Sequence, residues 1–214
     1  MTPNREIERR AFAVDRMEVR AADDDAKLRT IVGHAAVFNR DADIGGWFSE
    51  SVAPGAFKRA ISEDDVRSLF NHEPSYILGR NRAGTLKLAE DEQGLLSTTY
   101  PPDTSYARDL LVSIERGDVS QMSFAFRVLR EEWDETGDTL KRKILEVELF
   151  DVSPVTYPAY VQTDVGLRAV PHEIVERRGL VLALPGQRVP ALLMPRPGQT
   201  AARRMRQKLR ERGE

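Results

Sequence analysis

Cysteine is absent from the 214-residue chain, and histidine occurs only three times. The lack of cysteine excludes disulfide bonds, thiolate catalysis and cysteine-ligated zinc, and it fits a reducing compartment. Long apolar runs are also missing: none approaches the roughly 20 residues that a membrane span needs, and the charged start MTPNREIERR is unlike a secretory signal. The formal net charge of -2 disfavours bulk nucleic-acid binding, which usually leaves a basic footprint. We therefore expect a soluble, intracellular protein.

What remains is the composition of a folded domain with a solvated surface. Hydrophobic residues make up 41% of the chain and charged residues 31%, which suits one domain with appendages. We expect an N-terminal arm over 1–27, built as a loop or a lightly structured segment, a folded domain over 28–170, and a basic, proline-containing tail over 171–214.

From Arg177 onward the tail has ten Lys or Arg and two acidic residues, and it ends in a basic helical pattern. Such a tail binds nucleic acid or an acidic partner, or is a solvated appendage, which is the commonest case.

The spacing of apolar residues predicts an α+β fold that is mainly β. Strands are expected at 28–38, 66–75, 85–89, 95–100, 119–128 and 140–160. Helices are expected at 54–61 and 103–117, and the second has an apolar stripe and a glycine, Gly117, that can end it. The acidic stretch 131–139 is typical of a hairpin loop, and turns are expected at Glu73-Pro74 and Ser153-Pro154.

Ser123 interrupts the apolar strand VSQMSFAFRV at 119–128. Alternation places Met122, Phe124 and Phe126 on one face and Ser123 on the other. A hydroxyl in such a strand is either bonded to a neighbour or is a nucleophile. A serine nucleophile needs a nearby base, because its hydroxyl is weakly reactive at neutral pH.

Three histidines are the candidates for that base. His172 lies at the edge of the tail, and His34 lies within a strand, where a packed or solvent-facing histidine is the commoner case. His72, in LFNHEPS, lies at a strand end, where catalytic groups are often found on a rigid scaffold. A metal site is the rival interpretation, but no HExxH or paired-histidine spacing occurs, so we expect neither a metal nor a cofactor.

A carboxylate is the usual third partner of such a pair, because it orients the imidazole and stabilises its positive charge. ILEVELFDVS offers Glu146, Glu148 and Asp151. Alternation places the two glutamates on one face, which is commonly a solvent-facing face. It places Asp151 on the face of Val147 and Leu149, where a buried carboxylate would need a partner such as histidine.

Six segments, in this order, resemble the prohead proteases of tailed bacteriophages in the HK97 group. They are VGHAAVFN, GGWFSESVAPGAF, FNHEPSYILGR, GTLKLAEDEQGLLSTTYPPDT, GDVSQMSFAF and LFDVSPVTYPAY. The resemblance covers about residues 28–168. It implies a fold related to the herpesvirus assembly proteases, a β-barrel surrounded by helices. It also implies a serine endopeptidase, and hence that 28–170 is a serine protease domain.

Residue by residue, the resemblance implies that Ser123 is the nucleophile and His72 the general base. Asp151 occupies the family's Glu/Asp position before Val-Ser and is the preferred third member, followed by Glu148 and then Glu146. His34 does not match a motif histidine. The donors that would stabilise the oxyanion stay open among backbone amides near Ser123 and the side chains of Arg80 and Arg127.

The resemblance also implies partners and a location. Family members act inside the immature capsid, the prohead, in the host cytoplasm. They cut the scaffold or the scaffolding part of the capsid protein, and often themselves. We therefore expect these substrates, with self-cleavage and dimerisation as further contacts of the chain with its own copies, and neither a membrane nor a specific nucleic-acid sequence. Two alternatives remain: a catalytically inactive capsid-assembly protein of the same fold, and a small β-rich module that binds nucleic acid through its tail.

Overall fold

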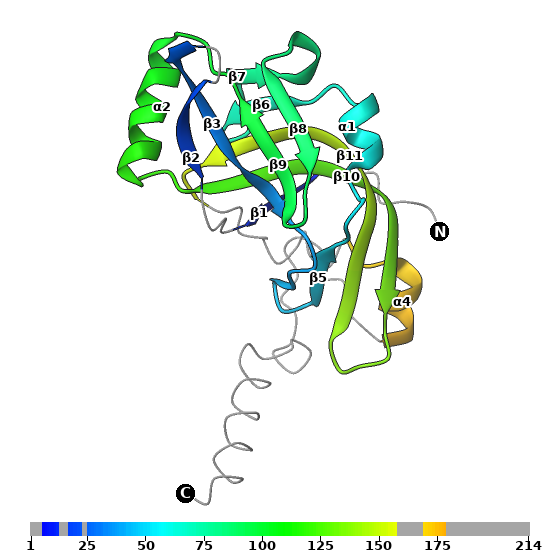
Figure 1. The fold of residues 1–214 in the computed structure, drawn as a ribbon. Helices are drawn as coiled ribbons and strands as arrows, with labels where there is room; N and C mark the ends of the chain where they lie inside the picture. The colour runs from blue at the N-terminus through cyan, green and yellow to red at the C-terminus, as the bar shows by residue number, and fades with distance from the viewer. Residues whose placement is uncertain (1–5, 13–16, 23–24, 158–168, 179–214) are drawn as a thin grey trace, which may run out of the picture.

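The computed structural model describes residues 6–12, 17–22, 25–157 and 169–178 (Figure 1). The strands are β1 (Glu8–Phe12), β2 (Glu18–Ala22), β3 (Asp25–Val37), β4 (Ala42–Ile44), β5 (Phe48–Val52), β6 (Arg67–Phe70), β7 (Glu73–Arg80), β8 (Leu86–Glu90), β9 (Gly94–Thr99), β10 (Gln121–Asp134) and β11 (Leu140–Val155). The helices are α1 (Lys58–Glu63), α2 (Ser105–Arg116) and α4 (His172–Arg178), with a 3₁₀ turn at Asn81–Ala83. The protein is therefore mainly β with a few helices, as the sequence predicts.

Hydrogen bonds join these strands into two sheets. The larger sheet runs β1-β10-β11-β5-β4, with β6 also on β11 and β7 on β6, and the smaller runs β2-β3-β9-β8. The main core contains apolar residues of both sheets and of α1. The expected β-barrel is not confirmed, because the described strands form two separate sheets rather than one closed ring.

Helix α2 shows how the local sequence fixes an element. Its buried residues Leu110, Leu111 and Ile114 form the predicted stripe, and they pack with Ile31 of β3 in a second core. The helix ends where Gly117 adopts φ 84, a left-handed conformation that glycine adopts at little cost. The helix expected at 54–61 is also present, but it spans Lys58–Glu63.

The long hairpin of β10 and β11 organises the larger sheet. In Figure 1 it crosses the body of the molecule, and its tip extends beside α4. The predicted loop at 131–139 is wrong in part, because β10 continues to Asp134 and pairs with Lys141. Trp133 on this extension contacts the ring of Phe48, within a third cluster that also contains residues of α4. The apolar packing of the tip explains why acidic residues there are in a strand.

Three further expectations are corrected. The N-terminal segment 1–27, expected as a loop or a lightly structured arm, contains β1 and β2, each paired in a sheet. The strand expected at 66–75 is two strands joined at Asn71-His72, so the turn precedes Glu73-Pro74. Strand β11 runs without a turn through Ser153-Pro154 to Val155.

The tail contributes helix α4 to the described residues, while its predicted basic helix and the rest of 179–214 lie outside them. In the part of the chain that the structure describes, no helix is long and apolar enough to cross a membrane.

Candidate active site

Ser123 lies near the beginning of β10, on a strand that is covered on both faces. Its apolar face lies in the main core, as predicted, but the opposite face is buried as well, and Ser123 is 0% exposed. Pairing with β11 sets Ser123 opposite Ser153 and Ala125 opposite Asp151. Opposed residues, and residues two apart along a strand, share a face. Ser123, Ser153 and Asp151 therefore lie on one face of the hairpin.

A β-bulge brings Asp151 to this face. Asp151 pairs with Ala125, but Leu149 pairs with Phe126, so Phe150 is an extra residue in β11. Such a bulge redirects the side chains that follow it. The expectation that Asp151 shares a face with Leu149 is therefore wrong: Leu149 points into the core, and Asp151 lies on the face of Ser123. The expected burial is confirmed, because Asp151 is 7% exposed.

His72 comes from the two-residue turn between β6 and β7. Phe70 pairs with Glu73 across this turn, and Asn71 and His72 between them have φ values of 54 and 58. Positive φ at both positions is the pattern of a type I′ hairpin turn, in which glycine is favoured at the second position. Strand β6 pairs with β11 at Asp151, so the turn lies beside the end of β11.

His72 connects the other two predicted residues through hydrogen bonds. Its Nε2 lies 2.7 Å from Oγ of Ser123, and its Nδ1 lies 2.6 Å from Oδ1 of Asp151. The side chains of His72 and Asp151 are only 9% and 10% exposed, so water screens this pair little. The hydroxyl of Ser153 donates to the same carboxylate oxygen at 2.6 Å. When Nδ1–H donates to Asp151, Nε2 is left as an acceptor, which is the tautomer that a general base requires.

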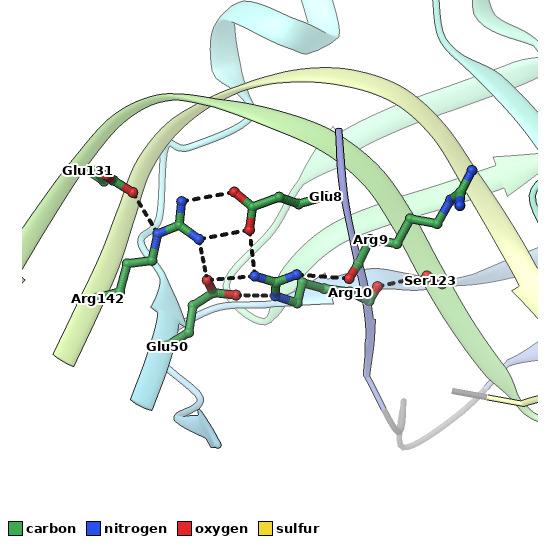
Figure 2. Close-up of polar contacts among 7 residues, drawn as sticks. All are labelled: Glu8, Arg9, Arg10, Glu50, Ser123, Glu131 and Arg142. Carbon is green, nitrogen blue, oxygen red and sulfur yellow. Dashed lines mark hydrogen bonds and ion pairs between the residues drawn. The ribbon is translucent and has the colours of Figure 1, made fainter. Parts of the chain in front are cut away.

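The hydroxyl of Ser123 has a second partner on β1. It donates to the backbone carbonyl of Arg10 at 2.9 Å, and β1 pairs with β10 so that Ala11 lies opposite Ser123. Figure 2 shows this contact beside a group of buried charged side chains. A serine hydroxyl has only one proton, so donation to Arg10 competes with donation to His72.

The buried charges fix β1 to the sheet. Five side chains form this ion cluster: Glu8, Arg10, Glu50, Glu131 and Arg142 (Figure 2). Arg142 is 0% exposed in its side chain and lies within 2.8 Å of a carboxylate oxygen of Glu8 and of one of Glu50. Burial alone would raise the pKa of Glu8. The hydrogen bonds and positive charges of Arg142 and Arg10 lower this pKa by more than burial raises it, so the pKa lies below the ordinary value.

The runner-up carboxylates lie in other ion pairs. Glu148 pairs with Arg127. Glu146 lies 3.5 Å from Arg59 and 3.9 Å from Arg130. The hydrogen-bond partner of His72 is Asp151 rather than either glutamate.

The other candidate side chains lie in separate contacts. Arg80 donates to Asp65 at 2.7 and 2.5 Å, and this hydrogen bond is the main cause that lowers the pKa of Asp65 to about 2. His34 lies 2.8 Å from Asp91 and lines a pocket of about 530 Å³ on the smaller sheet. The side chain of His172 on α4 is 72% exposed. The structure thus brings together His72, Ser123 and Asp151. Arg80, His34 and His172 lie in other surroundings.

Sequence reasoning missed three contributors to the site: Asn71, Ser153 and the backbone of Arg10. Ser153 could have been found, because it follows Asp151 by two residues in a strand and so shares its face. Asn71 carries a weaker signal, an asparagine before histidine where a type I′ turn favours Asn-Gly. No local signal in ERRAF indicates the contact of Arg10 with Ser123.

Comparison with known proteins agrees with the resemblance seen in the sequence. A family model described as the caudovirus prohead serine protease matches residues 15–178, which include His72, Ser123 and Asp151. The prohead protease of Enterobacteria phage HK97 is 32% identical over 146 residues, 66% of this chain and 60% of that protein, so the aligned part spans less than two thirds of the relative. The structure of the bacteriophage T4 capsid assembly protease, gp21, is similar with a TM-score of 0.50 and 10% identity, over 72% of this chain and 98% of that one; this likeness supports the fold alone. By sequence, the chain belongs to the family of caudovirus prohead serine proteases.

Proposed function

We propose that this chain is a serine endopeptidase in which Ser123 is the nucleophile, His72 the general base and Asp151 the residue that orients the imidazole. The observation that carries the proposal is the unbroken hydrogen-bonded path from Oγ of Ser123 through the imidazole to Oδ1 of Asp151, with distances of 2.7 and 2.6 Å. Family membership supports it independently, because all three residues lie within the matched segment.

The reaction is acyl transfer to Ser123 followed by hydrolysis. His72 takes the hydroxyl proton as Oγ attacks the peptide carbonyl, and the same proton then passes to the leaving amine. Water, activated by the same imidazole, releases the acyl group from Ser123 and restores the enzyme. Asp151 stays ionised and stabilises the imidazolium that forms in each step. The donated bond from Ser153 holds the carboxylate in the orientation that this requires.

The oxyanion in this proposal is bound by backbone amides near Ser123. Arg80 and Arg127 were the side-chain candidates, but their guanidinium groups are paired with Asp65 and Glu148. Breaking these pairs would add a cost to every turnover, whereas displacement of β1 would free the β10 amides that pair with it, and β11 still holds the strand in place.

Catalysis also requires β1 to move. Ser123 is 0% exposed, and its hydroxyl donates to the carbonyl of Arg10. While β1 lies against β10, Oγ of Ser123 is enclosed and its proton is directed to the carbonyl of Arg10 rather than to His72. The described arrangement is therefore a resting state of the proposed enzyme, and displacement of β1 frees both the nucleophile and its proton.

The substrates we propose follow from the names of the relatives, a prohead protease and a capsid assembly protease. They are a scaffold protein or the scaffolding part of the major capsid protein, together with the chain itself. The reaction takes place inside the prohead in the host cytoplasm, and the enzyme forms a dimer there. The fold in this proposal is a relative of the herpesvirus assembly proteases.

The test is co-expression of the full chain with a capsid or scaffold protein from the same genome, read by intact mass. Wild type and Ser62→Ala, an exposed serine on α1, should give the same defined fragments, and Ser123→Ala should give none. Equal cutting by Ser123→Ala would refute the assignment of the nucleophile. Absence of cutting by wild type, also inside assembled proheads, would favour the inactive assembly protein instead.

A further inference from the structure

The turn that carries His72 is conformationally costly. Asn71 and His72 follow one another with φ values of 54 and 58, in the left-handed region that few residues with side chains adopt, although asparagine, aspartate and histidine adopt it more often than the others. Glycine would relieve the strain at the second position, but His72 stands there. Such strain persists only where the surrounding structure imposes it, so something must hold this turn.

The strand pairing of β6 with β7 is irregular next to the turn at Asn71 and His72. The register shifts between Ser68 and Leu69 and again between Leu69 and Phe70. These two irregularities lie directly before the turn. The regular ladder that would normally fix a hairpin turn is therefore interrupted at the approach to His72.

Asn71 supplies the missing attachment, with one hydrogen bond to Pro154 near the end of β11 and two to Thr156, which directly follows the strand. Its backbone N–H donates to the carbonyl of Pro154 at 3.0 Å. Its side-chain Nδ2 donates to Oγ1 of Thr156 at 3.2 Å, and its Oδ1 accepts from the backbone N–H of Thr156 at 2.9 Å. A backbone N–H can only donate, so the group that faces the N–H of Thr156 must be the side-chain oxygen of Asn71. The side-chain nitrogen is then the group that faces the hydroxyl of Thr156.

The same strand end carries the other half of the site. Asp151 and Ser153 lie shortly before Pro154 on β11, and Asp151 accepts from Ser153 and is hydrogen-bonded to Nδ1 of His72. Asn71 thus attaches the backbone of His72 to the backbone of its acid partner by a path of a few residues. A small rotation of the turn would lengthen the bonds of the imidazole on both sides.

We propose that Asn71 is a positioning residue for the proposed peptidase: it holds the left-handed turn against the end of β11 so that the imidazole of His72 meets Asp151 and Ser123 together. Asn71 itself touches no reacting atom. The expected effect of Asn71 on kcat rests on the proposed function. Its expected effect on the bond between Nδ1 of His72 and Asp151 does not, because that bond exists without turnover.

Two substitutions distinguish the effect of the side-chain hydrogen bonds of Asn71 from the effect of its positive φ. Asn71→Gly accepts the positive φ but lacks the side-chain bonds, whereas Asn71→Asp keeps the acceptor for the N–H of Thr156 and loses the donor to its hydroxyl. On a peptide that wild type cleaves, we expect Asn71→Gly to lower kcat by about 100-fold, the scale of a small misplacement of a catalytic group, with KM within about twofold. We expect Asn71→Asp to keep most of the activity. Asn39→Gly, at another asparagine with positive φ (53), is the matched control and should leave kcat unchanged.

The structural readout is the low-field NMR signal of the Nδ1 proton of His72, recorded on the full chain with each variant shown to be folded by its urea unfolding curve. We expect the signal in wild type and Asn39→Gly, and its loss or displacement in Asn71→Gly. Retention of both the signal and wild-type kcat in Asn71→Gly would overturn the positioning role. If wild type and Ser123→Ala are equally inactive, the proposed function fails, and the NMR signal alone then decides for or against the role of Asn71.

Discussion

The ion cluster that fixes β1 makes a strong prediction for Arg142→Met. Arg142 donates at 2.8 and 3.0 Å to Glu8, at 2.8 Å to Glu50 and at 2.6 Å to Glu131. Methionine keeps an unbranched apolar chain but has no charge and no hydrogen-bond donor. The variant therefore leaves three carboxylates, two of them fully enclosed, with Arg10 as the remaining cation of the cluster.

The expected loss of stability is large because the partners stay buried. Removing one member of a buried ion pair costs about 3–5 kcal/mol, since the remaining charge keeps its desolvation penalty. For a chain of this size, each kcal/mol corresponds to about 2–4 °C in Tm. We therefore expect Tm to fall by about 6–20 °C at neutral pH.

The loss of stability in Arg142→Met should be smaller at acidic pH than at neutral pH. In wild type the arginines hold the pKa of Glu8 below its ordinary value, so this carboxylate contributes stability above the ordinary pKa, and the contribution is lost as pH falls through the folded pKa. In Arg142→Met burial acts against fewer cations, so the folded pKa of Glu8 rises, and protonation relieves the penalty. The free energies of unfolding of the two proteins should therefore approach each other as pH falls toward the ordinary pKa of glutamate.

The measurement is urea unfolding of wild type and variant across this pH range, with Arg20→Met as the control. Arg20 pairs with Glu18, but its side chain is 60% exposed, and exposed pairs contribute at most about 1 kcal/mol. A change below about 1 kcal/mol in Arg142→Met, or a deficit that does not vary with pH, would refute the reasoning.

Three further outcomes are expected. Asp151→Asn should lower kcat by about 10⁴-fold on a cleaved peptide, because an amide that donates to the imidazole selects the wrong tautomer; a folded variant with wild-type kcat would exclude Asp151 as the third member. Ser153→Ala removes a buried donor to that carboxylate, so urea unfolding should show a loss of about 1.5–3 kcal/mol. Gly94→Ala would place a Cβ 1.9 Å from a backbone oxygen of β3 and should cost about 1–3 kcal/mol or more in thermal unfolding, whereas Gly137→Ala, whose Cβ would lie 3.9 Å from its nearest neighbour, should change Tm little.

The candidate site could be predicted because its residues lie in recognisable segments. Ser123 is conspicuous as a hydroxyl in an apolar strand, and Asp151 as an acid among apolar neighbours. The choice of His72 among three histidines rested mainly on the family resemblance. The geometry that joins them was less accessible: the bulge at Phe150 reverses the face of Asp151, and a strict alternation contains no signal for an extra residue.

The turn before Glu73 was misplaced for a related reason. Pro74 is a strong turn signal, yet it lies within β7. Among the strands that the structure describes, β7 pairs with β6 alone, and an edge strand tolerates a residue that lacks an N–H. The turn lies at Asn71 and His72 instead, where the second residue is unfavourable for such a turn. A local rule therefore fails at the position that the proposed chemistry needs.

Strand β1 is the largest failure of local reasoning, and its cause is long-range charge complementarity. ERRAF is polar, and polar segments near a terminus are usually exposed. Here Glu8 and Arg10 alternate with an exposed Arg9, so that both point toward Arg142, which follows Glu8 by 134 residues. Their burial becomes favourable only when these partners meet. The segment expected as a loop or a lightly structured arm is thus the one whose backbone accepts a hydrogen bond from Ser123, and only the folded chain brings the two together.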